Sequence, residues 1–267
     1  MDKSFESAFV AALDWWASVG VEVPKTAAQK PKIRPKAPSP QTSAHKASTP
    51  KPHRNAQPSE DHSTPSLEAQ IEAIQKLAAP AKDLPALKTA ISGYDMGTLS
   101  ANANSCVFSR GNPKSSLMII GEAVGRDEDI AGKPFVGRAG QLLDLMLAAI
   151  GLTEDDVYIT NVINWRPPGN RNPSPEEIEL FRPFLTRHIT LAAPKALLIV
   201  GGVSLTAMTG LNGIMKNRGQ WQSVKINGEN IPALPIYHPA FLLRRPEMKK
   251  EAWRDLLALH DKLSELT

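Results

Sequence analysis

Short apolar runs that end in glycine or in a polar residue divide the C-terminal two hundred residues of the chain. Four segments rich in apolar residues are expected to be strands, at residues 116–121, 157–162, 196–201 and 233–237, and the first of them is a continuous apolar run. Continuous apolar runs of this length are typical of parallel strands that are buried on both faces. The stretches between them have the apolar spacing of helices. We therefore expect an α/β fold with three α/β/α layers around a central, mostly parallel four-stranded sheet.

The expected helices have recognisable ends. A capping-box spacing joins Ser174 to Glu177 with proline at the first helical position, so a helix starts there, and Pro183 is expected to kink it. Gly151 follows an apolar helical stretch as a typical C-terminal stop. Helices are expected over residues 67–77, 84–91, 141–150 and 248–266, from residue 174, and after the glycine turn at 201–204.

Residues 1–23 form a segment that is too short to be a domain. Phe5, Phe9, Leu13 and Trp16 fall at i, i+4, i+8 and i+11, which places them along one face of a short amphipathic helix. Such a helix either docks back on the rest of the chain or lays its aromatic face in the groove of a protein partner. The long linker that follows favours the partner.

Residues 24–66 are rich in proline and strongly basic. This segment has nine prolines and eight Lys or Arg residues against two acids, a net charge of +6, whereas residues 1–23 carry −3 and residues 67–267 carry +1. With almost no large apolar side chain it is expected to be a disordered linker before a catalytic domain over residues 67–267. Its bases either attract a polyanion such as DNA without sequence preference or merely keep the linker soluble.

The composition is that of a globular protein without a membrane span. Hydrophobic residues make up 42% and charged residues 22% of the 267 residues, and no run approaches the ~20 apolar residues that a membrane span needs. The single cysteine, Cys106, can form no internal disulfide and cannot supply the three or four thiolates of a zinc or iron–sulfur site. We expect a monomeric cytoplasmic protein with no targeting signal, no metal and no membrane partner.

Polar residues follow each of the four predicted strands. They are Glu122 within a glycine turn at 121–125, Asn161, the glycine turn at 201–204, and His238. Since ligands of parallel α/β folds bind beyond the carboxyl ends of the strands, these residues are expected to meet in one crevice. None is specific alone, because the first turn lacks both the Lys-Ser/Thr of a phosphate loop and the third glycine of a dinucleotide fingerprint. A histidine or asparagine at a strand end can also be purely structural.

Four longer motifs resemble, in order and spacing, the family 4 uracil-DNA glycosylases of the wider uracil-DNA glycosylase superfamily. They are GEAVGRDED at 121–129, GKPFVGRAGQLL at 132–143, YITNVINWRPPGNRNPSPEE at 158–177 and HPAFLLRRP at 238–246. The resemblance covers residues 84–263. It implies a monofunctional enzyme that hydrolyses the N-glycosidic bond of deoxyuridine in DNA, releases uracil and leaves an abasic site, which initiates base-excision repair. No lysine stands at a motif position where a Schiff base would form, so strand cleavage is not expected.

The resemblance implies a role for each polar residue of the crevice. Glu122 positions or activates water and offsets positive charge on the sugar. His238 donates a hydrogen bond to the uracil anion that develops as the bond breaks. Asn161 reads the O4 and N3–H edge of uracil, and Phe135 is either the platform on which the flipped base stacks or an ordinary core residue. Backbone groups complete the pocket, and they belong to Gly121, Ala123 and Val124.

The neighbouring acids Glu128 and Asp129 are expected to be solvated or to cap the turn. The segment after the histidine resembles the minor-groove wedge of the family, with Leu243 or Arg244 filling the space of the flipped base. Arginines and a loop hydroxyl near the crevice suit phosphate contacts. The residues expected to contact DNA are Arg166, Arg171, Ser204, Phe241, Leu242, Leu243, Arg244 and Arg245.

The chain departs from the family pattern in two places. The family usually carries a four-iron cluster held by four cysteines, and the matching positions here are Tyr94, Gly97, Trp165 and Phe181. We therefore expect a member without a cofactor, in which aromatic side chains that each bury about 150–250 Å² fill the space of the cluster. Val124 stands where the family commonly has proline, and it leaves one more backbone N–H.

Two other functions are compatible with parts of this pattern. The first is a noncatalytic module that binds uracil or single-stranded DNA and recruits a partner through the N-terminal helix. Retention of Glu122, Phe135, Asn161 and His238 together favours the enzyme, because a binding module needs no carboxylate to direct water. The second is a nucleotide hydrolase, which the lack of a phosphate loop disfavours.

Overall fold

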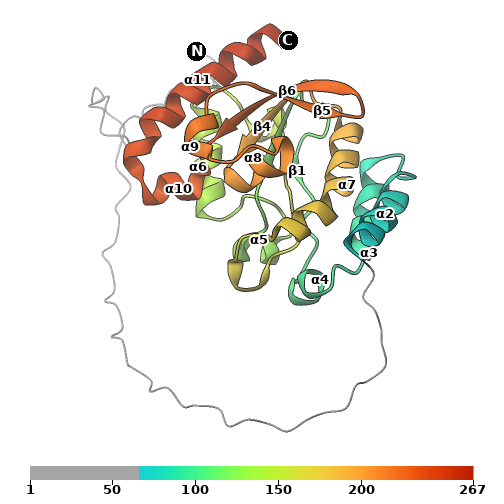
Figure 1. The fold of residues 1–267 in the computed structure, drawn as a ribbon. Coiled ribbons are helices and arrows are strands. Elements are labelled where there is room, and N and C mark those ends of the chain that lie inside the picture. The colour runs from blue at the N-terminus through green and yellow to red at the C-terminus, as the bar shows by residue number, and fades with distance from the viewer. Residues whose placement is uncertain (1–65, 267) are drawn as a thin grey trace, which may run out of the picture. The chain divides into compact units, whose positions relative to one another are not determined.

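The computed structural model describes residues 66–266 (Figure 1). The predicted helix over residues 1–23 and nearly all of the predicted linker over residues 24–66 lie outside this range and stay predictions. Within the described residues a six-stranded sheet has the order β1-β3-β2-β4-β6-β5. Its strands are β1 (Arg110–Gly111), β2 (Leu117–Gly121), β3 (Val157–Asn161), β4 (Ala196–Val200), β5 (Gln222–Ile226) and β6 (Glu229–Ile236).

The four predicted strands are the parallel centre of this sheet. β3, β2, β4 and β6 run parallel to one another, and Gly121 at the end of β2 pairs in register with Asn161 at the end of β3. The expected α/β class is confirmed. The sheet also has two antiparallel edge strands, β1 and β5, which were not predicted. The first has only two residues, and the second alternates exposed and buried positions without an apolar run.

Helices cover both faces of the sheet. They are α2 (Leu67–Ala78), α3 (Leu84–Gly93), α4 (Thr98–Asn102), α5 (Arg126–Ala131), α6 (Arg138–Ala148), α7 (Pro175–Ala192), α8 (Gly202–Thr209), α9 (Ile214–Asn217), α10 (Pro239–Arg244) and α11 (Lys249–Leu266). The predicted capping box is present, because Ser174 and Glu177 each accept a backbone N–H from the other. α7 continues through Pro183 as one helix.

Two apolar clusters, one on each face of the sheet, form the core. In β2, Met118 and Ile120 belong to the cluster beneath α3 and α7, whereas Leu117 and Ile119 belong to the cluster beneath α6 and α11. This alternation follows from the two-residue period of a strand. Figure 1 shows α6, α10 and α11 on one side of the sheet and α7 with α2 and α3 on the other, which are the outer layers of the predicted fold.

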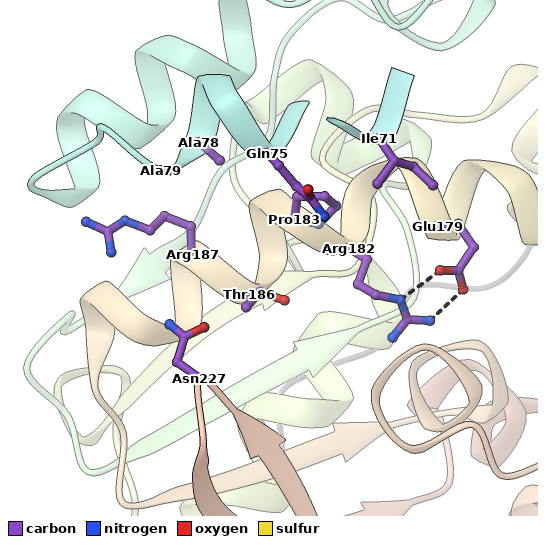
Figure 2. Close-up of a pocket in the computed structure, with 10 residues that line it drawn as sticks. All are labelled: Ile71, Gln75, Ala78, Ala79, Glu179, Arg182, Pro183, Thr186, Arg187 and Asn227. Carbon is purple, nitrogen blue, oxygen red and sulfur yellow. Dashed lines mark hydrogen bonds and ion pairs between the residues drawn. The ribbon is translucent and has the colours of Figure 1, made fainter. Parts of the chain in front are cut away.

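A groove of about 380 Å³ lies between α2 and α7 (Figure 2). Its walls include Ile71, Ala78 and Pro183, and an ion pair between Arg182 and Glu179 lies beside it. The groove shares no residue with the predicted crevice at the strand ends. Among the described helices, none is long and apolar enough to cross a membrane.

A buried histidine on α7 couples the stability of the fold to pH. The His188 ring stacks on Phe108 with ring centroids 4.2 Å apart, and its Nε2 lies 2.9 Å from the Tyr158 hydroxyl. Burial lowers the pKa of His188 to about 3 and raises the pKa of Tyr158 to about 12. Both groups are therefore neutral in the folded protein over the whole physiological range.

Acid is expected to destabilise the protein through His188. In the unfolded chain this ring takes up a proton below about pH 6.5, but in the folded protein only near pH 3. The unfolded state thus binds more protons between these values, and the free energy of unfolding falls as the pH drops, by up to about 1.4 kcal/mol per unit. Urea unfolding at several pH values should show a shallower fall for His188→Gln. Equal slopes for the two proteins would rule this coupling out.

Candidate active site

The residues that follow the parallel strands meet at one edge of the sheet. A Cβ placed on Gly121 would lie 2.2 Å from Asn161 Oδ1 and 2.4 Å from Phe135 Cε2, so the amide and the ring both press against this glycine. A Cβ on Gly201 would lie 2.2 Å from Glu122 Oε1 and 3.1 Å from His238 Cβ. The structure therefore brings together the residues that the sequence placed in one crevice.

Alanine at position 121 is expected to disrupt this crevice without straining the backbone. The φ angle of Gly121 is one that other residues adopt, but the added methyl would overlap Asn161 and Phe135. A displacement of such groups by about 1 Å can cost roughly 100-fold in activity. We expect a loss of this size in kcat/KM for Gly121→Ala. Gly202→Ala is the matched control because a Cβ there meets nothing within 4 Å, and similar losses in both variants would contradict the crowding argument.

Asn161 carries a buried amide that has no hydrogen-bond partner among the described residues. Its residue is 3% exposed, yet its side-chain amide makes no hydrogen bond to any residue between 66 and 266. Asn164, which is 4% exposed, shows the usual arrangement, because its Nδ2 donates to the Val107 carbonyl at 3.0 Å. Buried polar groups are nearly always hydrogen-bonded. The Asn161 amide therefore offers one donor and one acceptor, side by side, to a ligand.

Phe135 lies beside this amide in an unusual backbone conformation. Its ring stacks on the His238 imidazole, with centroids 5.8 Å apart and planes at 26°. Its φ angle of 54° is left-handed, a conformation that costs a non-glycine residue roughly 1–2 kcal/mol. Such strain persists only where the surroundings enforce it, and it is concentrated at functional sites. Phe135 is thus a core residue that is also held against the crevice.

His238 is arranged as a neutral hydrogen-bond donor. It caps the N-terminus of α10, where its Nδ1 accepts the Ala240 N–H at 3.1 Å. A neutral ring with an acceptor at Nδ1 carries its hydrogen on Nε2. Burial lowers the pKa of His238 and the Arg244 charge lowers it further, against the opposite effects of Glu122 and Glu128. The Nε2–H group is therefore present at neutral pH.

Within the part of the chain that the structure describes, Glu122 is fixed through one carboxylate oxygen. Its Oε1 accepts the Val203 N–H, in the first turn of α8, at 3.2 Å. Its Oε2 accepts no hydrogen bond from the residues that the structure describes, so this oxygen can bind water. The N–H groups of Ala123 and Val124 likewise have no hydrogen-bond partner between residues 66 and 266. Val124 stands where the resembling family commonly has proline, which has no N–H, so the valine supplies one of these two donors.

Three of the predicted DNA contacts have other roles in the structure. Leu242 is completely buried in the core beneath α10 and cannot be part of a wedge. Ser204 is also completely buried, and its hydroxyl donates to the Val200 carbonyl. Arg171 makes a bidentate ion pair with Glu177, with distances of 2.6 and 2.7 Å. The sequence motifs could not reveal which side of α8 and α10 faces the core.

The other predicted DNA contacts remain accessible. On and after α10, Leu243 is 38% exposed and the neighbouring Arg244 and Arg245 are exposed, whereas Phe241 is half-buried against Tyr237 with ring centroids 5.0 Å apart. Arg166 is half-buried and donates from Nε to Asn170 Oδ1 at 2.6 Å.

Neither Glu128 nor Asp129 is fully solvated, and both carboxylates cap backbone N–H groups, although of segments outside their own turn. Asp129 is 1% exposed and accepts hydrogen bonds from the backbone and side chain of Asn104. Glu128 is half-buried and accepts the N–H groups of Val136 and Gly137 in the next motif. These partners lie eight or more residues away along the chain, so no local pattern predicts them.

The positions that match the cluster cysteines of the resembling family form part of an aromatic cluster. Trp165 and Phe181 meet edge to face with ring centroids 5.6 Å apart, and Phe184 lies 6.4 Å from Phe181 and 6.1 Å from Tyr94. Gly97 adopts a φ of 60° at the start of α4. These residues offer no thiolate, so a cluster held by four cysteines does not fit here. In residues 66–266 no group of three or more His, Cys, Asp or Glu could hold a metal.

Comparison with known proteins defines the class of this α/β fold and its crevice. A family model described as the uracil DNA glycosylase superfamily matches residues 108–257, which include every element of the site. The chain belongs to this superfamily.

Among curated proteins, the chain is similar to several type-4 uracil-DNA glycosylases. The chain is 42% identical over 146 residues to a type-4 uracil-DNA glycosylase of Archaeoglobus fulgidus, covering 53% of this chain and 73% of the relative. It is 37% identical over 179 residues to that of Pyrobaculum aerophilum, covering 65% and 91%. It is 40% identical over 160 residues to that of Saccharolobus solfataricus, covering 58% and 74%.

Proposed function

We propose that this protein hydrolyses the N-glycosidic bond of deoxyuridine in DNA, releases uracil and leaves an abasic site for base-excision repair. The uracil-DNA glycosylase relatives support this activity. The observation that carries the proposal is the buried Asn161 amide, which lies beside the Phe135 ring and has no hydrogen-bond partner within residues 66–266. An amide with one free donor and one free acceptor matches the imide edge of uracil.

Base selection follows from the pairing of Asn161. Its Nδ2 donates to uracil O4 and its Oδ1 accepts from N3–H, while the flipped base stacks on Phe135. Cytosine offers an amino donor at position 4 and no hydrogen at N3, so both contacts become unfavourable. A site built to pair with a polar edge strongly rejects a base that leaves its buried groups unpaired.

Bond cleavage uses Glu122 and His238, which both lie beside Gly201. Departure of uracil leaves positive charge on the sugar and negative charge on the base. The His238 Nε2–H donates to the developing anion, as the donors of an oxyanion hole do. The free Oε2 of Glu122 holds a water molecule, accepts its proton as the water attacks the sugar, and offsets the positive charge. The proton that Glu122 takes from water passes to the uracil anion through solvent, so the products are free uracil and an abasic site with an intact strand.

DNA binding is assigned to exposed side chains on and after α10 and to Arg166 in the loop after β3. Leu243 enters the stack in place of the flipped base, Arg244 and Arg245 contact phosphates, and the half-buried Arg166 contacts a further phosphate.

The protein works without an iron–sulfur cluster in this proposal. The single cysteine and the aromatic side chains at three of the four matching positions support it. Packing of Tyr94, Trp165, Phe181 and Phe184 joins the segment before α4, the loop after β3, and α7. Metal analysis and a visible spectrum of freshly purified protein test the proposal, and stoichiometric iron with cluster absorbance would refute it.

Labelled oligonucleotides with one deoxyuridine, single- and double-stranded, test the activity. After incubation with the protein and heating in alkali, breakage at the uracil position is expected, and matched oligonucleotides with cytosine should stay intact. Tight binding of the uracil strand without breakage would instead favour the noncatalytic binding module.

A further inference from the structure

Loop 132–137, which carries Phe135, is held on both sides by charged side chains, the buried Arg110 and the half-buried Glu128. We propose that Arg110 and Glu128 are positioning residues for base recognition, which fix this loop so that the Phe135 ring faces the crevice. The inference rests on the proposed function. It assigns a task to two side chains that take no part in the steps above.

Arg110 fixes the carbonyl side of the loop. It comes from the edge strand β1, and its side chain is only 6% exposed. Its Nε donates to the Pro134 carbonyl at 2.9 Å and its Nη2 to the Phe135 carbonyl at 3.3 Å. The same Nη2 pairs with Asp144 of α6 at 2.5 Å. A planar guanidinium with several donors suits this arrangement, because it reaches two carbonyls and a carboxylate at once.

Glu128 fixes the amide side of the loop. Its Oε1 accepts the N–H groups of Val136 and Gly137 at 3.0 and 2.9 Å. Its Oε2 lies 2.4 Å from where a Cβ on Gly125 would stand, so the carboxylate packs against the glycine turn that carries Glu122. One side chain thus ties together the two motifs that flank the crevice.

These contacts explain why Phe135 keeps a left-handed backbone. The carbonyls of residues 134 and 135 and the N–H groups of residues 136 and 137 are all held, so the peptide groups on either side of Phe135 cannot rotate freely. Gly140 completes the enclosure, since a Cβ there would lie 1.8 Å from the Phe135 carbonyl oxygen. Without the clamp a phenylalanine would relax to negative φ and carry its ring away from His238 and Gly121.

Kinetics of four variants test the clamp. Glu128→Ala and Arg110→Ala are each expected to lower kcat/KM on a deoxyuridine oligonucleotide about tenfold or more. Glu128→Gln should restore most of the activity, because its amide oxygen can still accept both N–H groups. Asp127→Ala is the matched control, since this neighbouring acid makes no hydrogen bond to loop 132–137 in the described residues. If Glu128→Gln loses as much as Glu128→Ala, the charge rather than the loop matters, and the proposal is overturned.

A double-mutant cycle with Phe135→Ala separates positioning from a general structural role. If Glu128 acts through Phe135, adding Glu128→Ala to Phe135→Ala should change kcat/KM by less than about twofold. If the double variant instead loses activity by the product of the two single losses, the proposal is overturned. Wild-type protein that leaves uracil in place would instead defeat the proposed function.

Hydrogen exchange tests the clamp without any need for activity. Exchange in a peptide that covers loop 132–137 is expected to become faster in Glu128→Ala and to stay near wild type in Glu128→Gln and Asp127→Ala. Unchanged exchange in Glu128→Ala would refute the clamp even if the activity changed.

Discussion

Replacing Asn161 with alanine is expected to lower kcat/KM for uracil excision by about 100- to 1,000-fold, the usual effect of removing a preorganised polar contact. It is also expected to leave the folded protein at least as stable as wild type. The amide is buried without a partner between residues 66 and 266, so its removal relieves an unsatisfied group instead of breaking a bond. The variant should therefore lose uracil excision while its free energy of unfolding is unchanged or higher.

Asn164→Ala is the control for this prediction. Its Nδ2 is already bonded to the Val107 carbonyl, so its loss should reduce stability by about 1–3 kcal/mol and change kcat/KM much less. Urea unfolding and steady-state kinetics on both variants provide the comparison. A clear loss of stability in Asn161→Ala would mean that the amide has a structural partner and is not reserved for the base.

Replacing His238 with asparagine is expected to reduce kcat by about 100- to 1,000-fold, because the shorter asparagine amide does not place an N–H where the histidine Nε2–H meets the uracil anion. Asparagine is a favourable N-cap, so this variant can keep the cap of α10 that the histidine provides. The fold should therefore survive, and the loss should be in kcat more than in KM. Stability close to wild type, measured by thermal unfolding, is the control.

The pH profile of the wild-type enzyme tests the same histidine in a different way. Burial lowers the pKa of His238, so the neutral donor is already fully present above the ordinary value of about 6.5. We expect excision to change little from pH 9 down to about that value and to be lost only at lower pH. A rate that rises as the pH drops from 8 to 6 would show that the protonated ring is the active form.

Local sequence patterns predicted the strands that are buried over most of their length, and they did not predict the edge strands. β2, β3 and β4 are buried along their whole length and β6 over its second half, so a segment rich in apolar residues marks each of them. β5 lies at an edge with mixed exposure, and β1 is too short to leave a pattern. Topology then placed Glu122, Asn161 and His238 at one edge, because parallel strands end together.

Other features depend on contacts between distant parts of the chain. Leu242 and Leu243 are neighbours in one motif, but the packing of α10 buries the first and exposes the second. Arg110 reaches carbonyls 24 and 25 residues away, and nothing in its immediate sequence marks it as different from a surface arginine. A three-dimensional structure was needed to find such residues.

The in-register pairing of Gly121 with Asn161 sets a rule for how this pocket can vary. A side chain in a strand reverses its direction with every one-residue shift, so a single insertion or deletion within β3 would turn the Asn161 amide to the opposite face of the sheet, and one within β2 would move Gly121 out of register with it. The connection between the two strands has no such requirement and can change in length. Base preference in relatives of this chain should thus diverge through substitutions at the strand ends, while insertions accumulate in the connecting segments.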